Sequence, residues 1–163
     1  MYRKEKRRSA ALYIGAGAAV VICLAVIAFL VWSMAMKNSY RALCLEINDA
    51  ILATPIEDCA IGCGGDEYPA DKGVLDYYDR FLLEERIMPF SRKTVPADDR
   101  TITLTLGDNR LLLTGVGDGT AVNVAWATPA GSRSYTVRSG SIFFSQLRAY
   151  YTNYAHRVSA GGN

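Results

Sequence analysis

An uninterrupted apolar run occupies residues 10–36 and constrains this chain more than any other feature of its sequence. Only Ser33 interrupts the apolar and small residues, and no charged residue appears until Lys37. A helix of about 20 apolar residues is enough to cross a hydrocarbon core of about 30 Å. We therefore expect residues 10–36 to form a transmembrane anchor. The sequence holds no second run of this kind, which predicts a single-pass membrane protein.

Aromatic and basic residues predict the borders and the orientation of this anchor. Tyr13 and Trp32 lie 19 positions apart, about 28 Å along a helix. Both rings would then sit at membrane–water interfaces, where Tyr and Trp are enriched. Residues 1–9 form a leader with five basic residues and one acidic residue. Basic residues favour the cytoplasmic side, so we expect a cell-membrane protein with a cytoplasmic N-terminus and an extracytoplasmic C-terminal domain.

A cleaved signal peptide is the alternative to an anchor. The apolar part of a signal peptide spans about 7–15 residues, roughly half the run seen here. The segment 33–35 (Ser-Met-Ala) is also a poor cleavage site, so we expect an uncleaved signal-anchor.

Ala11, Gly15 and Ala19 recur at every fourth position. Small residues at this spacing let two helices approach closely in lipid, which makes this face a candidate for self-association.

Residues 37–158 are expected to form one extracytoplasmic domain, followed by a flexible tail at residues 159–163. Without the leader, the chain has 13 basic and 15 acidic residues, a net charge of −2. Nucleic-acid binders neutralise phosphates with an excess of Lys and Arg. The charge balance therefore argues against a nucleic-acid partner. A domain of this length can bury one modest hydrophobic core.

Helical periodicity continues beyond the anchor and returns twice in the domain. The stripe after the span indicates that the transmembrane helix continues into an amphipathic helix that ends near Pro55. Residues 55–71 are acidic and Gly-rich, which predicts an irregular loop. A second amphipathic helix is expected over residues 73–88, followed by a linker to about Asp99. A third helix, with an aromatic stripe that seals one face of a sheet, is expected from Ser141 as its N-cap.

Between the linker and the third helix the apolar pattern changes to a period of two. In residues 101–106, Ile and Leu alternate with Thr, as in a half-buried strand. Residues 107–109 (Gly-Asp-Asn) predict a hairpin turn to a second strand over residues 110–114. Two further strands are expected around Val122–Trp126 and Ser134–Val137. Short links favour an antiparallel meander of about four strands with flanking helices, an α+β fold.

Three cysteines, Cys44, Cys59 and Cys63, lie outside the predicted membrane span. In an oxidising compartment two of them are expected to form a structural disulfide, which leaves one thiol over. A Cys59–Cys63 bridge would close a small loop, whereas Cys44 bonded to either would tie that loop to the first helix. Geometry decides between these pairings, so the sequence leaves them open. The remaining thiol is a candidate for a bridge between two anchored copies.

Other residues that carry chemistry form no recognisable site. His156 and the three cysteines lack the two close ligand pairs of a structural zinc site. Asp66, Glu67 and Asp71 lack the spacing of an EF-hand calcium loop. The sequence has no nucleophile elbow, phosphate loop or zinc-protease motif. We therefore expect no cofactor or metal, and enzymatic activity is disfavoured.

The plan of a long N-terminal helix leading into an antiparallel sheet is similar to that of type IV pilins and pseudopilins. The resemblance concerns architecture only. Pilin precursors have a Gly-Phe-type cleavage site directly before the apolar run and a Glu five residues later. Residues 9–13 (Ser-Ala-Ala-Leu-Tyr) show neither feature, so membership of that family is not inferred.

Two functional hypotheses follow from the sequence. The first is a non-enzymatic interaction or assembly subunit that displays its domain next to the membrane, with membrane lipid and a protein partner or a second copy as its contacts. The alternative is an extracytoplasmic thiol–disulfide protein or another enzyme that uses Cys59 and Cys63. Those two cysteines have three residues between them rather than the two of a thioredoxin-type motif, which favours the first hypothesis.

Overall fold

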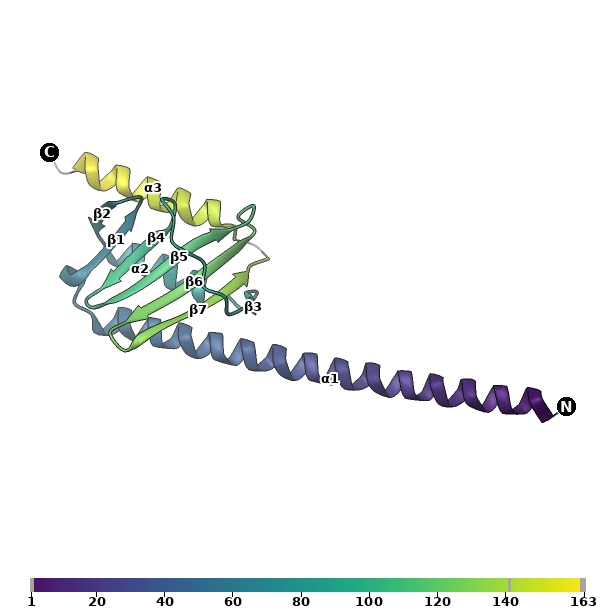
Figure 1. The fold of residues 1–163 in the computed structure, drawn as a ribbon. Coiled ribbons are helices and arrows are strands. Elements are labelled where there is room, and N and C mark those ends of the chain that lie inside the picture. Colours follow the sequence, from purple (N-terminus) through teal and green to yellow (C-terminus); the bar gives the residue numbers. More distant parts are fainter. Residues whose placement is uncertain (1, 141, 162–163) are drawn as a thin grey trace. The chain divides into compact units, whose positions relative to one another are not determined.

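The computed structural model describes residues 2–140 and 142–161, with side chains from Gly17 onward. It divides into two compact units, residues 1–36 and 37–163. Helix α1 covers Tyr2–Ala53 and ends shortly before Pro55, as predicted (Figure 1). Over the described residues the fold contains three α-helices and one seven-stranded antiparallel sheet. The predicted α+β class with a long apolar N-terminal helix is therefore confirmed.

The seven strands form one sheet in the order β2-β1-β4-β5-β6-β7-β3, and every neighbouring pair is antiparallel. The strand bounds are β1 Cys59–Cys63, β2 Asp66–Pro69, β3 Met88–Ser91, β4 Ile102–Leu106, β5 Asn109–Val116, β6 Ala121–Thr128 and β7 Gly131–Arg138. Strands β4 to β7 are the predicted meander. The prediction of about four strands is wrong in number, because β1, β2 and β3 lie in segments that were expected to be loop, helix end or linker.

The segment 55–71 was expected to be an irregular loop but contains a complete β-hairpin. After a short 3-10 helix, η1 (Ile56–Asp58), strands β1 and β2 pair around a two-residue turn. Gly64 and Gly65 have φ of 65° and 95°, as a type I′ turn requires at both central positions. A Cβ on Gly62 would lie 2.8 Å from the carbonyl oxygen of Asp66. The glycines that suggested a loop are therefore the residues that permit the hairpin.

Helix α2 covers Lys72–Leu82 and is shorter than the predicted helix over residues 73–88. The Asp71 carboxylate caps it by accepting a hydrogen bond from the backbone N–H of Val74 (2.8 Å). Beyond its C-terminus, Met88 pairs with Arg138 as β3 joins the edge of the sheet. Pro89 disfavours helical geometry in the residue before it and suits an edge strand. The predicted helix end was therefore too late.

Helix α3 covers Phe144–Gly161 and supplies the predicted aromatic stripe. The backbone N–H of Phe143 donates to the side-chain oxygen of Gln146 (2.9 Å), one half of a capping box. The predicted N-cap, Ser141, lies outside the described residues. The buried members of the stripe are Phe144, Leu147, Tyr151 and Tyr154. The helix runs to Gly161, so it includes part of the segment 159–163 that was expected to be a flexible tail.

The hydrophobic core of the domain lies between the sheet and residues 37–53 of α1, helix α2 and helix α3. On the core face, Ile102, Leu113 and Val124 are fully buried and lie side by side across β4, β5 and β6. Helix α2 contacts both other helices. The Tyr78 hydroxyl donates to the carbonyl oxygen of Leu147 on α3 (3.0 Å), and the Asn48 amide of α1 donates to Asp79 of α2 (2.9 Å). All three helices therefore cover one face of the sheet.

The segment 92–100, which we call the strap, crosses the other face of the sheet. It leaves the edge strand β3 and returns to the interior strand β4, so it passes in front of β7, β6 and β5 (Figure 1). This connection was predicted only as a linker. Its path places a run of backbone on the face that the helices leave open.

Candidate functional site

The predicted anchor is a helix with exposed apolar side chains. In the described residues, one helix is long and apolar enough to cross a membrane, and its most apolar window has a mean hydropathy of 2.7 and is 6% buried. Trp32 is 48% exposed, and Ala19 is also exposed. The side chains of Tyr13 and Gly15 lie outside the described residues. Among the side chains that are described here, the helix presents apolar groups that a lipid environment would solvate.

Cys44 lies in the core between α1 and α2. Its thiol donates to the carbonyl oxygen of Leu82 at 3.4 Å, and the Tyr40 hydroxyl donates to the same oxygen at 3.4 Å. Burial raises the pKa of the Cys44 thiol to about 11. Since the thiolate is the reactive form of cysteine, Cys44 is a packing residue with an inert thiol at neutral pH.

Cys59 and Cys63 stand at the two ends of strand β1. Four residues of extended strand separate their Cα atoms by about 13 Å, whereas a disulfide joins Cα atoms about 4.4–6.8 Å apart. All four cysteines of the chain are free in the structure, so the expected disulfide is not formed there. The thiol of Cys59 donates to the carbonyl oxygen of Pro55 (3.4 Å). Burial raises the pKa of both thiols.

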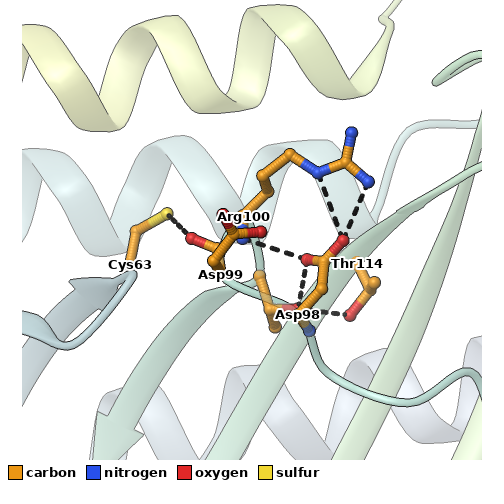
Figure 2. Close-up of polar contacts among 6 residues, drawn as sticks. Cys63, Asp98, Asp99, Arg100 and Thr114 are labelled. Carbon is orange, nitrogen blue, oxygen red and sulfur yellow. Dashed lines mark hydrogen bonds and ion pairs between the residues drawn. The ribbon is translucent and has the colours of Figure 1, made fainter.

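Cys63 contacts a polar junction where the strap enters β4 (Figure 2). Its thiol lies 3.7 Å from the carbonyl oxygen of Asp99. The neighbouring Asp98 carboxylate accepts two hydrogen bonds from the Arg100 guanidinium, at 2.9 and 3.2 Å. These bonds lower the pKa of Asp98. Thr101 joins Asp98 to Thr114 of β5 through its hydroxyl (3.1 and 3.0 Å), so the junction fixes the end of the strap on the sheet.

The middle of the strap is held by side chains of β6 and β7 instead of a strand ladder. Asn123 is 1% exposed. Its amide nitrogen donates to the carbonyl oxygen of Lys93 and to the Thr136 hydroxyl, both at 3.0 Å, and its oxygen accepts from the backbone N–H of Val95 at 3.5 Å. The Thr94 and Ser134 hydroxyls lie 3.0 Å apart. A single buried amide thus satisfies two backbone groups of the strap.

Beside the strap, the open face of the sheet forms a groove of about 390 Å³. Its floor carries the hydroxyls of Thr103 and Thr105, with Arg110 on one side. The Thr105 hydroxyl donates to the Glu67 carboxylate of β2 (3.1 Å). Gly62 also lines the groove. The groove combines hydroxyl, carboxylate and guanidinium groups, which suits hydrogen bonding to a polar surface.

The acidic and histidine residues weighed for metal binding have other positions in the structure. Glu67 bonds to Thr105 and Asp71 caps α2. His156 is exposed near the end of α3. Within the part of the chain that the structure describes, no three His, Cys, Asp or Glu side chains lie together in a group that could hold a metal ion.

No family model, curated protein or solved structure matches the chain.

Asn123, which binds the strap, and Thr114, which bonds to Thr101 at the end of the strap, were not recognised from sequence as functional or structural sites. One signal in the sequence pointed to Asn123. Asn123 stands between Ala121 and Ala125 on the outward-facing side of a strand. A polar residue among small ones on such a face is consistent with another segment packing over it, and here that segment is the strap.

Proposed function

We propose that the chain is a single-pass membrane protein and that residues 37–158 act outside the cytoplasm as a non-enzymatic interaction or assembly domain. The observation that carries the proposal is the helix whose described apolar side chains are exposed, joined in the same chain to a domain with its own core. The basic leader at residues 1–9 supports a cytoplasmic N-terminus. The partner is a protein or a second copy of the chain.

The environments of the cysteines support a non-enzymatic role over thiol–disulfide chemistry. Redox-active cysteines have lowered pKa values and a partner thiol within bonding distance. The pKa values of Cys44, Cys59 and Cys63 are all raised, with burial as the largest cause. Strand β1 also holds the two cysteines of the alternative proposal far apart.

The open groove supports the interaction role. Arg110 is exposed there, next to the threonine hydroxyls of β4. The strap covers only part of this face, so a polar strand surface stays accessible. Surfaces with placed hydrogen-bonding groups give specificity more than affinity, which suits an assembly contact already concentrated by a shared membrane.

Site-specific photo-crosslinking in intact membranes tests the proposal. A photoreactive amino acid replaces Arg110 in the groove or, as the matched control, Arg157, an exposed arginine on the helix side of the domain. We expect a discrete adduct from position 110 and a much weaker one from position 157. Two differently tagged copies distinguish self-association from a second protein. A chain that stays monomeric at both positions would contradict an interaction role through this face.

Two further measurements test the topology and the alternative. A protease added to spheroplasts should degrade residues 37–158 and spare the leader; the opposite pattern would overturn the orientation.

Thiol titration of the full chain should find Cys59 and Cys63 unreactive at neutral pH and without a disulfide between them. A rapidly cycling Cys59–Cys63 disulfide would favour the redox alternative.

A further inference from the structure

Exposed basic residues from two segments far apart in the sequence gather at one end of the domain. They are Lys37 and Arg41 on α1, Arg86 before β3, and Arg92 and Lys93 after it, and together they are called the basic patch. The Arg92 guanidinium donates to the Ser39 hydroxyl of α1 (3.1 Å), which joins the two segments. Glu84 and Glu85 lie in the loop between α2 and β3. The five basic residues outnumber these two, so the patch is net positive, although residues 37–85 as a whole are net negative.

The patch also includes a groove and exposed apolar side chains. Lys37, Arg41 and Leu45 of α1 line a groove of about 660 Å³ together with residues 82–85 and Ile87. Leu45 is 51% exposed, and on the other side of the loop Met88 and Phe90 of β3 are 59% and 44% exposed. Basic groups beside exposed apolar side chains are the composition of surfaces that lie at a membrane interface.

The chain itself holds this patch close to the predicted bilayer surface. Lys37 follows Trp32, the predicted interfacial residue, by five positions. Five residues span at most about 18 Å even when fully extended, whatever the angle between the two units. Along a helix the same five residues rise about 8 Å, which is comparable to the Debye length at physiological salt. With the anchor in a bilayer, headgroup charges would therefore act on Lys37, the patch residue nearest to the anchor.

We propose that the basic patch binds the anionic phospholipid headgroups of the leaflet from which the anchor emerges, with Met88 and Phe90 at the edge of the acyl region. This inference rests on the proposed membrane anchoring. Charge complementarity and the short tether favour lipid over an acidic protein. Bound in this way, the domain is held in one orientation at the membrane, and the groove beside the strap is presented in a fixed direction.

Tryptophan quenching in reconstituted vesicles tests the proposal on the full chain. Phe90→Trp places a reporter in the patch and keeps an aromatic ring under the Arg138 guanidinium, which lies 5.6 Å from the Phe90 ring centre. Ile56→Trp is the matched control, because Ile56 is 49% exposed and follows the far end of α1. The vesicles contain brominated phosphatidylcholine, alone or with about one third phosphatidylglycerol as the anionic lipid. The parent chain gives the background signal of the two native tryptophans, Trp32 and Trp126.

We expect at least about twofold stronger quenching of Phe90→Trp in the anionic vesicles, lost at high salt, and no change for Ile56→Trp. Lys37→Gln or Arg86→Gln should each weaken the docking equilibrium about fivefold, whereas Arg110→Gln on the strap face should leave it unchanged. Equal quenching of Phe90→Trp in both vesicle types would overturn the lipid assignment. If the basic patch is shielded from solvent in native membranes but Phe90→Trp shows no lipid-dependent quenching in vesicles, the lipid assignment is overturned in favour of a protein partner.

Alkaline extraction of native membranes separates this outcome from failure of the proposed function. A chain that stays in the membrane pellet but shows no lipid-dependent quenching keeps its anchor and loses the lipid contact. A chain released from the pellet has no transmembrane anchor, and both proposals then fail.

Discussion

The two faces of the sheet use the same strands in opposite ways. Val124 packs into the apolar core under the helices, while the neighbouring Asn123 faces the strap and makes two hydrogen bonds to the strap backbone and one to Thr136 of β7. Of the buried polar residues among the described side chains, Thr101, Thr114, Asn123, Ser134 and Thr136 belong to the strap face. One face supplies apolar burial, and the other uses polar groups to position a connection. We therefore expect substitutions on the two faces to differ in how much stability they remove and in how much of the domain they affect.

The largest effect is expected on the helix-covered face. Trp126 is 1% exposed, and its indole N–H donates to the Glu46 carboxylate (3.0 Å). Trp126→Ala should lower the free energy of unfolding by about 4 kcal/mol, because it leaves a large cavity in the core. Urea denaturation of the full chain in detergent measures this loss. Ala127→Ser, on the opposite face of β6, is the control and should change stability little. A cost below about 1 kcal/mol for Trp126→Ala would contradict the assignment of the core.

A smaller loss on the same face should come from Gly115, where α3 approaches β5. A Cβ at this position would lie 2.4 Å from the Phe144 ring. Gly115→Ala should therefore cost about 2 kcal/mol through overpacking. Gly140→Ala is the matched control, since no atom lies within 4 Å of its Cβ position.

Combining Gly115→Ala with Phe144→Leu tests the cause of that loss. If the two side chains clash, the combined cost should be less than the sum of the separate costs. Simple additivity would show that the glycine is needed for another reason.

On the strap face, Asn123→Ala should act locally. The substitution removes the amide that bonds to Lys93, Val95 and Thr136. We expect a loss of about 2 kcal/mol and faster hydrogen exchange confined to the strap. Ser132→Ala, an exposed position on the same face of β7, serves as the control. If hydrogen exchange became faster throughout the sheet instead, the strap face would not act independently of the helix-covered face.

The smallest expected effect is at the rim between α1 and the sheet. Glu46 accepts from Trp126 and pairs with Arg133, and the hydrogen bond from Arg133 is the main reason that the pKa of Glu46 is lowered. A carboxyl with a lowered folded-state pKa stabilises the fold above its unfolded pKa of about 4.3 and loses that contribution as the pH falls through the folded value. Both partners are half exposed, so Glu46→Gln should cost under about 1 kcal/mol at neutral pH.

Thermal unfolding at neutral and acidic pH measures this contribution. The gap between parent and Glu46→Gln should narrow as the pH falls below the ordinary carboxyl pKa. A gap that stays constant across that range would show that the charge of Glu46 is not the source of its effect.

Sequence reasoning succeeded where one periodicity extended over a whole element. The alternation of Ile and Leu with Thr in residues 101–106 predicted β4, and the long helix to Pro55 needed only apolar residues and the absence of breakers. It failed where a short strand depends on a distant partner. Strand β1 pairs with β4 some 40 residues later and β3 needs β7, while the Gly64-Gly65 turn between β1 and β2 was interpreted as part of a loop.

The candidate site was less predictable than the fold for the same reason. The spacing of Cys59 and Cys63 suggested a close pair as long as residues 55–71 were taken for a loop. Placed on a strand, the same two residues are far apart. Asn123 gained its role only from the path of the strap, which no pattern in residues 92–100 specifies.

The path of the strap imposes a time order on biogenesis. The strap is synthesised well before the strands that hold it, since Thr94 contacts Ser134 and Val95 contacts Asn123 at separations of 40 and 28 residues. Chains emerge from the ribosome at about 5–20 residues per second, so helix α1 has been made while the sheet is still incomplete. We expect the strap to close only after β7 has been made. Folding should then be slow for a domain of this size, because its sheet depends on late and distant pairings.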